Sequence, residues 1–253
     1  MSNPLKRKDM RLLLLSNSTN AGEAYLAWPK AEIKDFLGAF PLQVAFIPYA
    51  AITFSYDEYE AKVAAVFSEC NCTLKSVHRV WNPVEAIATA DVIVVGGGNT
   101  WRLVQQMREH NLFEAIKRKV AAGTPYIGWS AGSNIACPTM KTTNDMPIVD
   151  PHGLGTLGLV PFQINPHYLD AHPAGHGGET REDRIREFIE VNPDVFVVGL
   201  REGCLLRCED NELRLTGSKS ARLFRKNWIT KELQPTEDLS FLLDAALPQV
   251  PFC

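Results

Sequence analysis

The stretch from Thr124 to Cys137 constrains the fold most, because it combines a strand, a tight turn and the start of a helix. Its centre, residues 128–132, reads Gly-Trp-Ser-Ala-Gly and matches the pattern G-x-S-x-G. In this pattern a serine lies on a cramped strand-to-helix turn with its hydroxyl lifted out of the sheet, and small flanking residues let the turn close. Ser130 is therefore a candidate nucleophile. The alternative is a tight turn that happens to contain a serine.

Apolar runs of strand length alternate with helical patterns across the first half of the chain. The expected strands are 10–15, 43–47, 72–77, 91–95 and 125–128. The expected helices are 29–37, 55–69, 83–88, 101–109 and 112–122. This alternation predicts an α/β fold with a doubly wound, mostly parallel sheet and helices on both faces. Ligands of such folds bind beyond the carboxyl ends of the strands, where the loop 96–100 and Ser130 would both lie.

The second half of the chain changes in character. Residues 139–178 are rich in Pro, Gly, Asn, Asp and His and contain one expected strand, at 162–164. A loop segment of that length is usually functional or disordered. The elements expected after it are a helix at 180–190, a strand at 195–200, short antiparallel edge strands at 204–208, 212–215 and 221–225, and a helical turn or two at 241–246. With no repeat or linker, we expect one catalytic domain over residues 1–253, with 1–9 and 230–253 as peripheral extensions.

Composition excludes several classes of protein. A net charge of −3 argues against a general nucleic-acid or membrane-surface binder. No apolar run approaches the about 20 residues that a membrane-spanning helix needs, and the N-terminal segment lacks the apolar core of a secretion signal. The six cysteines form no C-x-x-C pair, which suits reduced thiols. We therefore expect a cytoplasmic protein without nucleic-acid or membrane partners.

A serine nucleophile needs a base within hydrogen-bond reach and a group that orients the base. The six available histidines are His78, His110, His152, His167, His172 and His176. His167 follows an apolar strand and the stiff Pro166, so its imidazole should emerge at the same sheet edge as Ser130. A metal site of His167, His172 and His176 is the competing interpretation. Their spacing fits no familiar zinc pattern, so we expect no metal ligands.

The glycine-rich loop 96–100 is a candidate oxyanion site. It fails as a dinucleotide loop, because the third glycine of G-x-G-x-x-G would fall at Trp101, and no G-K-[ST] follows for a P-loop. The backbone N–H groups of Gly98 and Ala131, from neighbouring strand ends, could instead converge on one oxygen. Such an arrangement stabilises the charge that develops during acyl transfer.

Several motifs in the same order resemble the peptidase E family of α-aspartyl dipeptidases. They lie at residues 15–19, 96–100, 127–132, 143–151, 163–167, 178–181 and 199–203. The resemblance covers roughly residues 10–227. It implies a serine peptidase on a fold related to class I glutamine amidotransferases, which cleaves dipeptides with N-terminal aspartate and uses no metal or cofactor.

The resemblance also assigns roles to residues. It implies that Ser130 is the nucleophile and His167 the base. Asp145 and Glu202 are both candidates for the group that orients the base. We favour Glu202 slightly, because it follows a buried strand and should reach the same sheet edge. Asp145 also suits a turn ahead of Pro147, which would be a purely structural role.

Specificity for aspartate requires a cation that faces the substrate carboxylate. Arg181 is our candidate, because a planar guanidinium suits a carboxylate and a cation is otherwise unfavourable beside a helix N-terminus. Asn99, in the glycine-rich loop, is a second substrate-binding candidate, and Glu179 or another acidic group could meet the substrate's α-amino group. The chain departs from the family pattern at Arg201, where bacterial members have proline, and at Ser133, where they have alanine.

These expectations describe a serine dipeptidase that hydrolyses Asp-Xaa through an acyl-enzyme on Ser130. Its partner would be a small peptide substrate, and we expect a monomer or a homodimer. One alternative is a peptidase that resembles cyanophycinase and acts on aspartyl polymers. The other is a small-molecule binding module that has the same fold but no catalytic activity.

Overall fold

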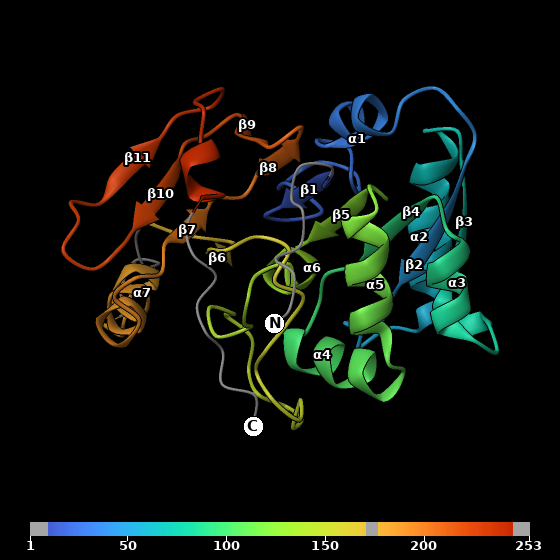
Figure 1. The fold of residues 1–253 in the computed structure, drawn as a ribbon, viewed down its shortest axis with the longest axis horizontal. Coiled ribbons are helices and arrows are strands. Elements are labelled where there is room, and N and C mark those ends of the chain that lie inside the picture. The colour runs from blue at the N-terminus through green and yellow to red at the C-terminus, as the bar shows by residue number, and fades with distance from the viewer. Residues whose placement is uncertain (1–9, 171–176, 245–253) are drawn as a thin grey trace.

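The computed structural model describes residues 10–170 and 177–244 (Figure 1). Within them, one large sheet consists of β1 (Leu12–Leu15), β2 (Leu42–Ile47), β3 (Cys72–Ser76), β4 (Val92–Val95), β5 (Tyr126–Trp129), β8 (Cys204–Glu209) and β9 (Glu212–Gly217). Their spatial order is β3-β2-β4-β5-β1-β8-β9. The strands from β3 to β1 are parallel to their neighbours, and β8 and β9 add an antiparallel edge. The predicted fold class is confirmed.

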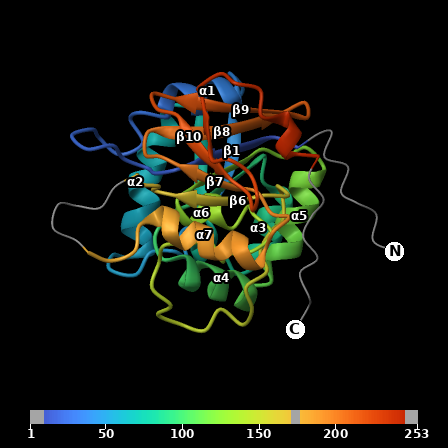
Figure 2. The ribbon, with the colours of Figure 1, turned by 90° about the vertical axis from the view of Figure 1, so that its left-hand side faces the viewer.

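Helices cover both faces of this sheet. They are α1 (Lys30–Leu37), α2 (Tyr56–Ser68), α3 (Pro83–Thr89), α4 (Thr100–Glu109), α5 (Leu112–Ala121) and α6 (Ala131–Asn134). The described part of the chain also contains α7 (Arg181–Val191) and the short 3-10 helices η2 (Val77–Arg79) and η3 (Ser240–Leu242). Alternate residues of β1 face opposite sides, as strand geometry requires. Leu13 and Leu15 pack in the core under α1 and α2, whereas Leu12 and Leu14 pack in the core under α3, α4 and α5. Figure 2 shows α2 and α5 on opposite sides of the sheet.

A second, smaller sheet was not expected from the sequence. It consists of β6 (Gln163–Pro166), β7 (Val197–Leu200), β10 (Ala221–Phe224) and β11 (Lys231–Leu233), in the order β11-β10-β7-β6. The parallel pair β6 and β7 brings His167 and the residues after Leu200 to one edge. The helix α7 packs against this sheet through Ile185 and Ile189. The strand expected at 221–225 therefore extends the second sheet and not the edge of the main one.

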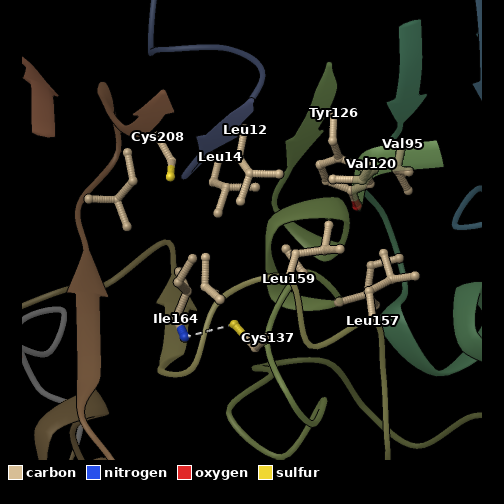
Figure 3. Close-up of a cluster of buried hydrophobic side chains, with 14 of the residues drawn as sticks. Leu12, Leu14, Val95, Val120, Tyr126, Cys137, Leu157, Leu159, Ile164 and Cys208 are labelled. Carbon is tan, nitrogen blue, oxygen red and sulfur yellow. Dashed lines mark hydrogen bonds between the residues drawn. The ribbon is translucent and has the colours of Figure 1, made fainter. Parts of the chain in front are cut away.

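The segment before β6, expected to be functional or disordered, is packed into the core. Leu157, Leu159 and Ile164 belong to the same buried cluster as Leu12 and Leu14 of β1 (Figure 3). Backbone hydrogen bonds join the segment to the residues that follow α6. Leu157 N donates to Ile135 O and Leu159 N donates to Ala136 O, both at 2.8–2.9 Å. The segment thus fixes β6 relative to β5. This link sets the separation between the two strands whose ends bear His167 and Ser130.

The region after residue 229, expected to be a peripheral extension, contributes to the core. Leu233 of β11, Leu239 and Leu242 are fully buried in the larger hydrophobic cluster. The other expected extension, residues 1–9, lies outside the described residues, as do 245–253. None of the helices in the described part of the chain is both long and apolar enough to span a bilayer.

Candidate active site

Ser130 occupies a strained turn between β5 and α6. Its backbone has φ 53° and ψ −112°, a conformation that non-glycine residues rarely adopt. The Ser130 N–H donates to Leu15 O at 3.1 Å, which anchors the turn to the neighbouring strand β1. The two glycines of the motif have no room for side chains. A Cβ on Gly128 would lie 2.6 Å from the Gly132 carbonyl, and one on Gly132 would lie 2.3 Å from Val95 O.

His167 lies at the end of β6 and contacts Ser130. Its Nε2 is 2.9 Å from Ser130 Oγ, and its Nδ1 is 2.7 Å from Glu202 Oε1. The His167 backbone N–H donates to Ser16 Oγ at 2.9 Å, and that hydroxyl donates to Leu200 O at 2.7 Å. Sequence reasoning did not single out Ser16. A buried serine directly after an apolar strand was the available signal, because such a hydroxyl needs hydrogen-bond partners.

The two carboxylate candidates occupy different places. Glu202 follows β7 and contacts the imidazole, as described above. Asp145 Oδ2 instead accepts hydrogen bonds from Thr100 N at 2.7 Å and from Thr100 Oγ1 at 2.6 Å. Asp145 O also accepts from Trp101 Nε1 at 3.0 Å. These contacts place the Asp145 carboxylate at the N-terminus of α4, where a negative charge is stabilised. In the structure, Glu202 is the carboxylate that contacts His167.

Arg201 adds no free charge beside Glu202. Its Nε donates to Asp170 Oδ2 at 2.7 Å, and its Nη1 donates to Glu232 Oε2 at 2.8 Å. These two carboxylates raise the pKa of the Arg201 guanidinium, and Arg201 in turn lowers the pKa of Glu232 to about 2. The side chain therefore ties the loop after β7 to β11, while Glu202 extends toward His167.

A cavity of about 530 Å³ lies in front of Ser130 and His167. One part of its wall is aromatic, formed by Tyr25, Phe54, Tyr59 and Trp129. Tyr59 Oη donates to Gly97 O at 3.0 Å and accepts from Trp129 Nε1 at 3.0 Å. Burial raises the pKa of Tyr59 to about 12, so its hydroxyl stays neutral and can hold both contacts. The cavity is also lined by Glu58, Lys62 and His167.

Two backbone N–H groups are available near the serine hydroxyl. Gly98 lines the cavity, and its N–H donates to no acceptor within the described residues. Ala131 is the first residue of α6, where the N–H groups have no acceptor inside the helix. The Gly97 carbonyl accepts a hydrogen bond from Tyr59. Gly97 also packs closely on Ser130, since a Cβ there would lie 2.9 Å from Ser130 Cβ.

The substrate-binding candidates Asn99 and Arg181 differ in their contacts. Asn99 caps α4, because its Oδ1 accepts from Arg102 N at 3.0 Å, and its Nδ2 donates to Met146 O at 3.0 Å. Both polar atoms of its amide are therefore engaged. Arg181 begins α7 and has no hydrogen bond or ion pair within residues 10–170 and 177–244. Burial lowers the pKa of its guanidinium, and nearby Asp145 opposes that shift.

Glu179, the other acidic candidate, pairs with Arg184 at 3.6 Å. The remaining histidines take no part in this site as far as the structure describes them. His172 and His176, and with them the alternative metal site, lie outside the described residues. One other group of possible metal ligands within them is Asp57, Glu60 and His78. Arg79 forms ion pairs with both of those carboxylates, so the group is part of an ion-pair network.

Comparisons with known proteins point in one direction. The model of peptidase family S51 matches residues 12–216. The protein named peptidase E of Nostoc sp. (strain PCC 7120) is 51% identical over 236 residues, which are 93% of this chain and 98% of the relative. Peptidase E of Streptomyces coelicolor is 48% identical over 236 residues, 93% of this chain and 96% of the relative.

A solved structure supports the same fold. The crystal structure of a peptidase from an acI-B1 Actinobacterium superposes with a TM-score of 0.68 and covers 92% of this chain and 98% of that one. At 17% sequence identity, this likeness concerns the fold alone.

Proposed function

The chain belongs to peptidase family S51 and is a serine-type peptidase, and on that premise we propose that it hydrolyses Asp-Xaa dipeptides through an acyl-enzyme on Ser130. The observation that carries the proposal is the hydrogen-bonded line from Ser130 Oγ to His167 Nε2 and from His167 Nδ1 to Glu202 Oε1. It ends at a serine on a tight turn that faces a cavity.

In the proposed mechanism, Ser130 Oγ attacks the substrate carbonyl while His167 Nε2 takes its proton. Glu202 accepts the Nδ1–H bond, which selects the tautomer with a free Nε2 and stabilises the imidazolium that forms. His167 then gives the proton to the leaving amine, and the peptide C–N bond breaks. Water enters, His167 removes its proton, and hydrolysis of the ester releases aspartate and restores the Ser130 hydroxyl.

The oxyanion of each tetrahedral intermediate needs donors that are already in place. We assign this role to the N–H groups of Gly98 and Ala131. The unpaired Gly98 N–H at the cavity and the position of Ala131 at the start of α6 support the assignment. Preorganised donors of this kind are worth about 3–4 kcal/mol each in serine peptidases.

Arg181 is our proposed partner for the aspartate side chain. Arg181 forms no ion pair within the described residues and is partly buried, so a substrate carboxylate would supply the contacts that the guanidinium lacks. Arg181 is close enough to Asp145, which accepts hydrogen bonds from Thr100 at the start of α4, for the two charges to interact. Asn99, by contrast, is assigned a structural role as the cap of α4.

A substrate panel tests the proposal. Purified protein from a host without its own aspartyl dipeptidase would be given Asp-Leu, Asn-Leu, Ala-Leu and N-acetyl-Asp-Leu. We expect hydrolysis of Asp-Leu and at least about hundredfold lower kcat/KM for Asn-Leu, because Asn-Leu has the same shape without the charge. Equal rates on Asp-Leu and Asn-Leu would contradict the specificity. Activity on β-aspartyl polymers alone would indicate the polymer peptidase, and inactivity on every peptide would indicate the binding module.

We also propose that the enzyme works in the cytoplasm as a monomer or a homodimer. The five cysteines in the described part of the chain are buried, and no disulfide joins any two of them, which suits a reducing compartment. Cell fractionation and sedimentation velocity would check the two statements separately.

A further inference from the structure

A lysine at the rim of the cavity has no role in the mechanism proposed above. Lys62 lies on α2, is exposed, and lines the cavity that also contains Ser130 and His167. Its Nζ is 4.2 Å from the centroid of the Tyr25 ring, so the ammonium is held over an aromatic face of the wall. Lys62 forms no hydrogen bond or ion pair with any of the residues that the structure describes.

Glu58, the acidic neighbour of Lys62, is hydrogen-bonded to Ser55 and forms no ion pair with Lys62. Glu58, one turn earlier on α2, accepts hydrogen bonds at Oε2 from Ser55 N at 2.8 Å and from Ser55 Oγ at 2.9 Å. These bonds complete the capping box of α2 and lower the pKa of Glu58. The carboxylate also lies in the first turn of the helix, where the helix dipole favours it. Lys62 is thus the cation at this rim that has no hydrogen-bond or ion-pair partner among the described residues.

Lys62 and Arg181, which form no ion pair among the described residues, are associated with helices on different faces of the main sheet. Lys62 belongs to α2, which covers the face that contains Leu13 and Leu15. Arg181 lies near Asp145, at the start of α4, and α4 covers the opposite face. An Asp-Xaa dipeptide likewise has two carboxylates, one on each side of the scissile bond. One belongs to the aspartate side chain, and the other is the C-terminus of the leaving residue.

The aromatic wall indicates which carboxylate belongs to Lys62. Tyr25, Phe54 and Trp129 offer apolar surface, which suits the side chain of the leaving residue better than it suits a charged aspartate. Resting on the proposed function, we propose that Lys62 binds the C-terminal carboxylate of Asp-Xaa while the Xaa side chain packs against this wall. Lys62 would thereby limit the substrate to two residues, since a longer peptide presents an uncharged amide at that point.

The test compares two substrates that differ in this one carboxylate, Asp-Leu and Asp-Leu-amide. The variants are Lys62→Met, which keeps the aliphatic stem over Tyr25, and Lys62→Arg, which keeps the charge. Lys75→Met is the matched control, because Lys75 is an exposed residue of β3 that does not line the cavity. The quantity measured is kcat/KM for each pair of enzyme and substrate.

We expect the wild type to prefer Asp-Leu over its amide by about tenfold, the size of one charge-assisted hydrogen bond. Lys62→Met should lose this preference by a fall on Asp-Leu alone, with the amide unchanged within about twofold. Lys62→Arg and Lys75→Met should keep the preference.

Equal losses of Lys62→Met on both substrates, or an unchanged preference, would overturn the inference while Asp-Leu hydrolysis by the wild type leaves the proposed function intact. A wild type that does not hydrolyse Asp-Leu would overturn both.

Discussion

Ser130 and His167 both have a positive backbone φ, which is unfavourable for residues other than glycine, and both are hydrogen-bonded to the end of β1. Both residues have φ 53°, and such left-handed positions cost a non-glycine residue about 1–3 kcal/mol. Hydrogen bonds to two consecutive residues, Leu15 and Ser16, offset this cost. Leu15 O accepts the Ser130 N–H at 3.1 Å, and Ser16 Oγ accepts the His167 N–H at 2.9 Å. The distance between Ser130 and His167 is therefore set through one short stretch at the end of a central strand, which is a rigid support for a site.

Replacement of the two candidate carboxylates by amides should have different effects. Glu202→Gln should lower kcat on Asp-Leu by about 10³-fold or more with little change in KM, because an amide can stabilise the wrong imidazole tautomer. Asp145→Asn should leave kcat within about tenfold and lower the melting temperature, because the Asp145 carboxylate accepts hydrogen bonds from Thr100 at the N-terminus of α4. Steady-state kinetics and thermal unfolding of both variants check this. A larger kcat loss in Asp145→Asn than in Glu202→Gln would contradict the assignment.

The sequence singles out Ser130 and His167 because each stands directly after an apolar strand with a distinctive local pattern. It favours Glu202 over Asp145 only slightly, since local pattern does not tell which side chain meets the imidazole. Lys62 had no signal at all. The sequence pattern puts Lys62 on the solvent face of a helix. Its place in the cavity wall depends on Tyr25, which comes from a loop far away in the sequence.

The elements that bring Glu202 to the site are β7 and the loop after it. Arg201 links this loop to β11 through Glu232 and to the chain after β6 through Asp170. Arg222 of β10 adds a contact to Glu232 at 3.3 Å. The network holds the second sheet together at the end where the His167 and Glu202 side chains meet. The charged groups of the network are partly exposed, so salt should weaken the ion pairs between them.

The contribution of Glu232 to stability should depend on pH. Arg201 and Ser220 lower the pKa of this carboxyl from 4.5 to about 2 in the folded protein. A lowered folded pKa stabilises the fold above the unfolded value, and this contribution is lost as the pH falls from about 4.5 toward about 2. The free energy of unfolding of the wild type should therefore exceed that of Glu232→Gln at about pH 6 and converge with it at about pH 2.5. Denaturant unfolding at the two pH values measures this, and a difference that stays constant would refute it.

Most elements of the main sheet could be predicted, because each strand is a continuous apolar run and each helix has a local start signal such as the capping box at Ser55 and Glu58. The second sheet could not, since its pairings join residues far apart in sequence, such as Ile164 with Val198. The strand β11 was missed because two of its three residues, Lys231 and Glu232, are charged and exposed. Its one buried side chain, Leu233, leaves too little pattern to recognise.

The molecule as a whole consists of one large sheet with a smaller sheet beside it, and the site lies where the strand ends of the two meet (Figure 1). Ser130 comes from the large sheet, whereas His167 and Glu202 come from the smaller one. Activity therefore depends on the packing between them, through the buried segment that contains Leu157 and Leu159 and through the leucines that follow β11.

Removal of the region after residue 229 should destabilise the whole molecule. Leu233, Leu239 and Leu242 are fully buried, and each leucine of this kind contributes about 1.5–3 kcal/mol. We compare a chain that ends at Ile229 with a chain that ends at Asp244, so that only residues 230–244 differ. The shorter chain should melt at a lower temperature or fail to fold. Equal melting temperatures would show that this region is dispensable for stability.

The proposed attack of Ser130 on the substrate can be tested by the rate at which Ser130→Ala hydrolyses Asp-Leu. Removal of the hydroxyl leaves the cavity and the His167–Glu202 pair in place but removes the attacking atom. We expect kcat to fall by about 10⁴-fold or more while the variant keeps the melting temperature of the wild type. A folded Ser130→Ala protein that hydrolyses Asp-Leu within about tenfold of the wild-type rate would contradict it.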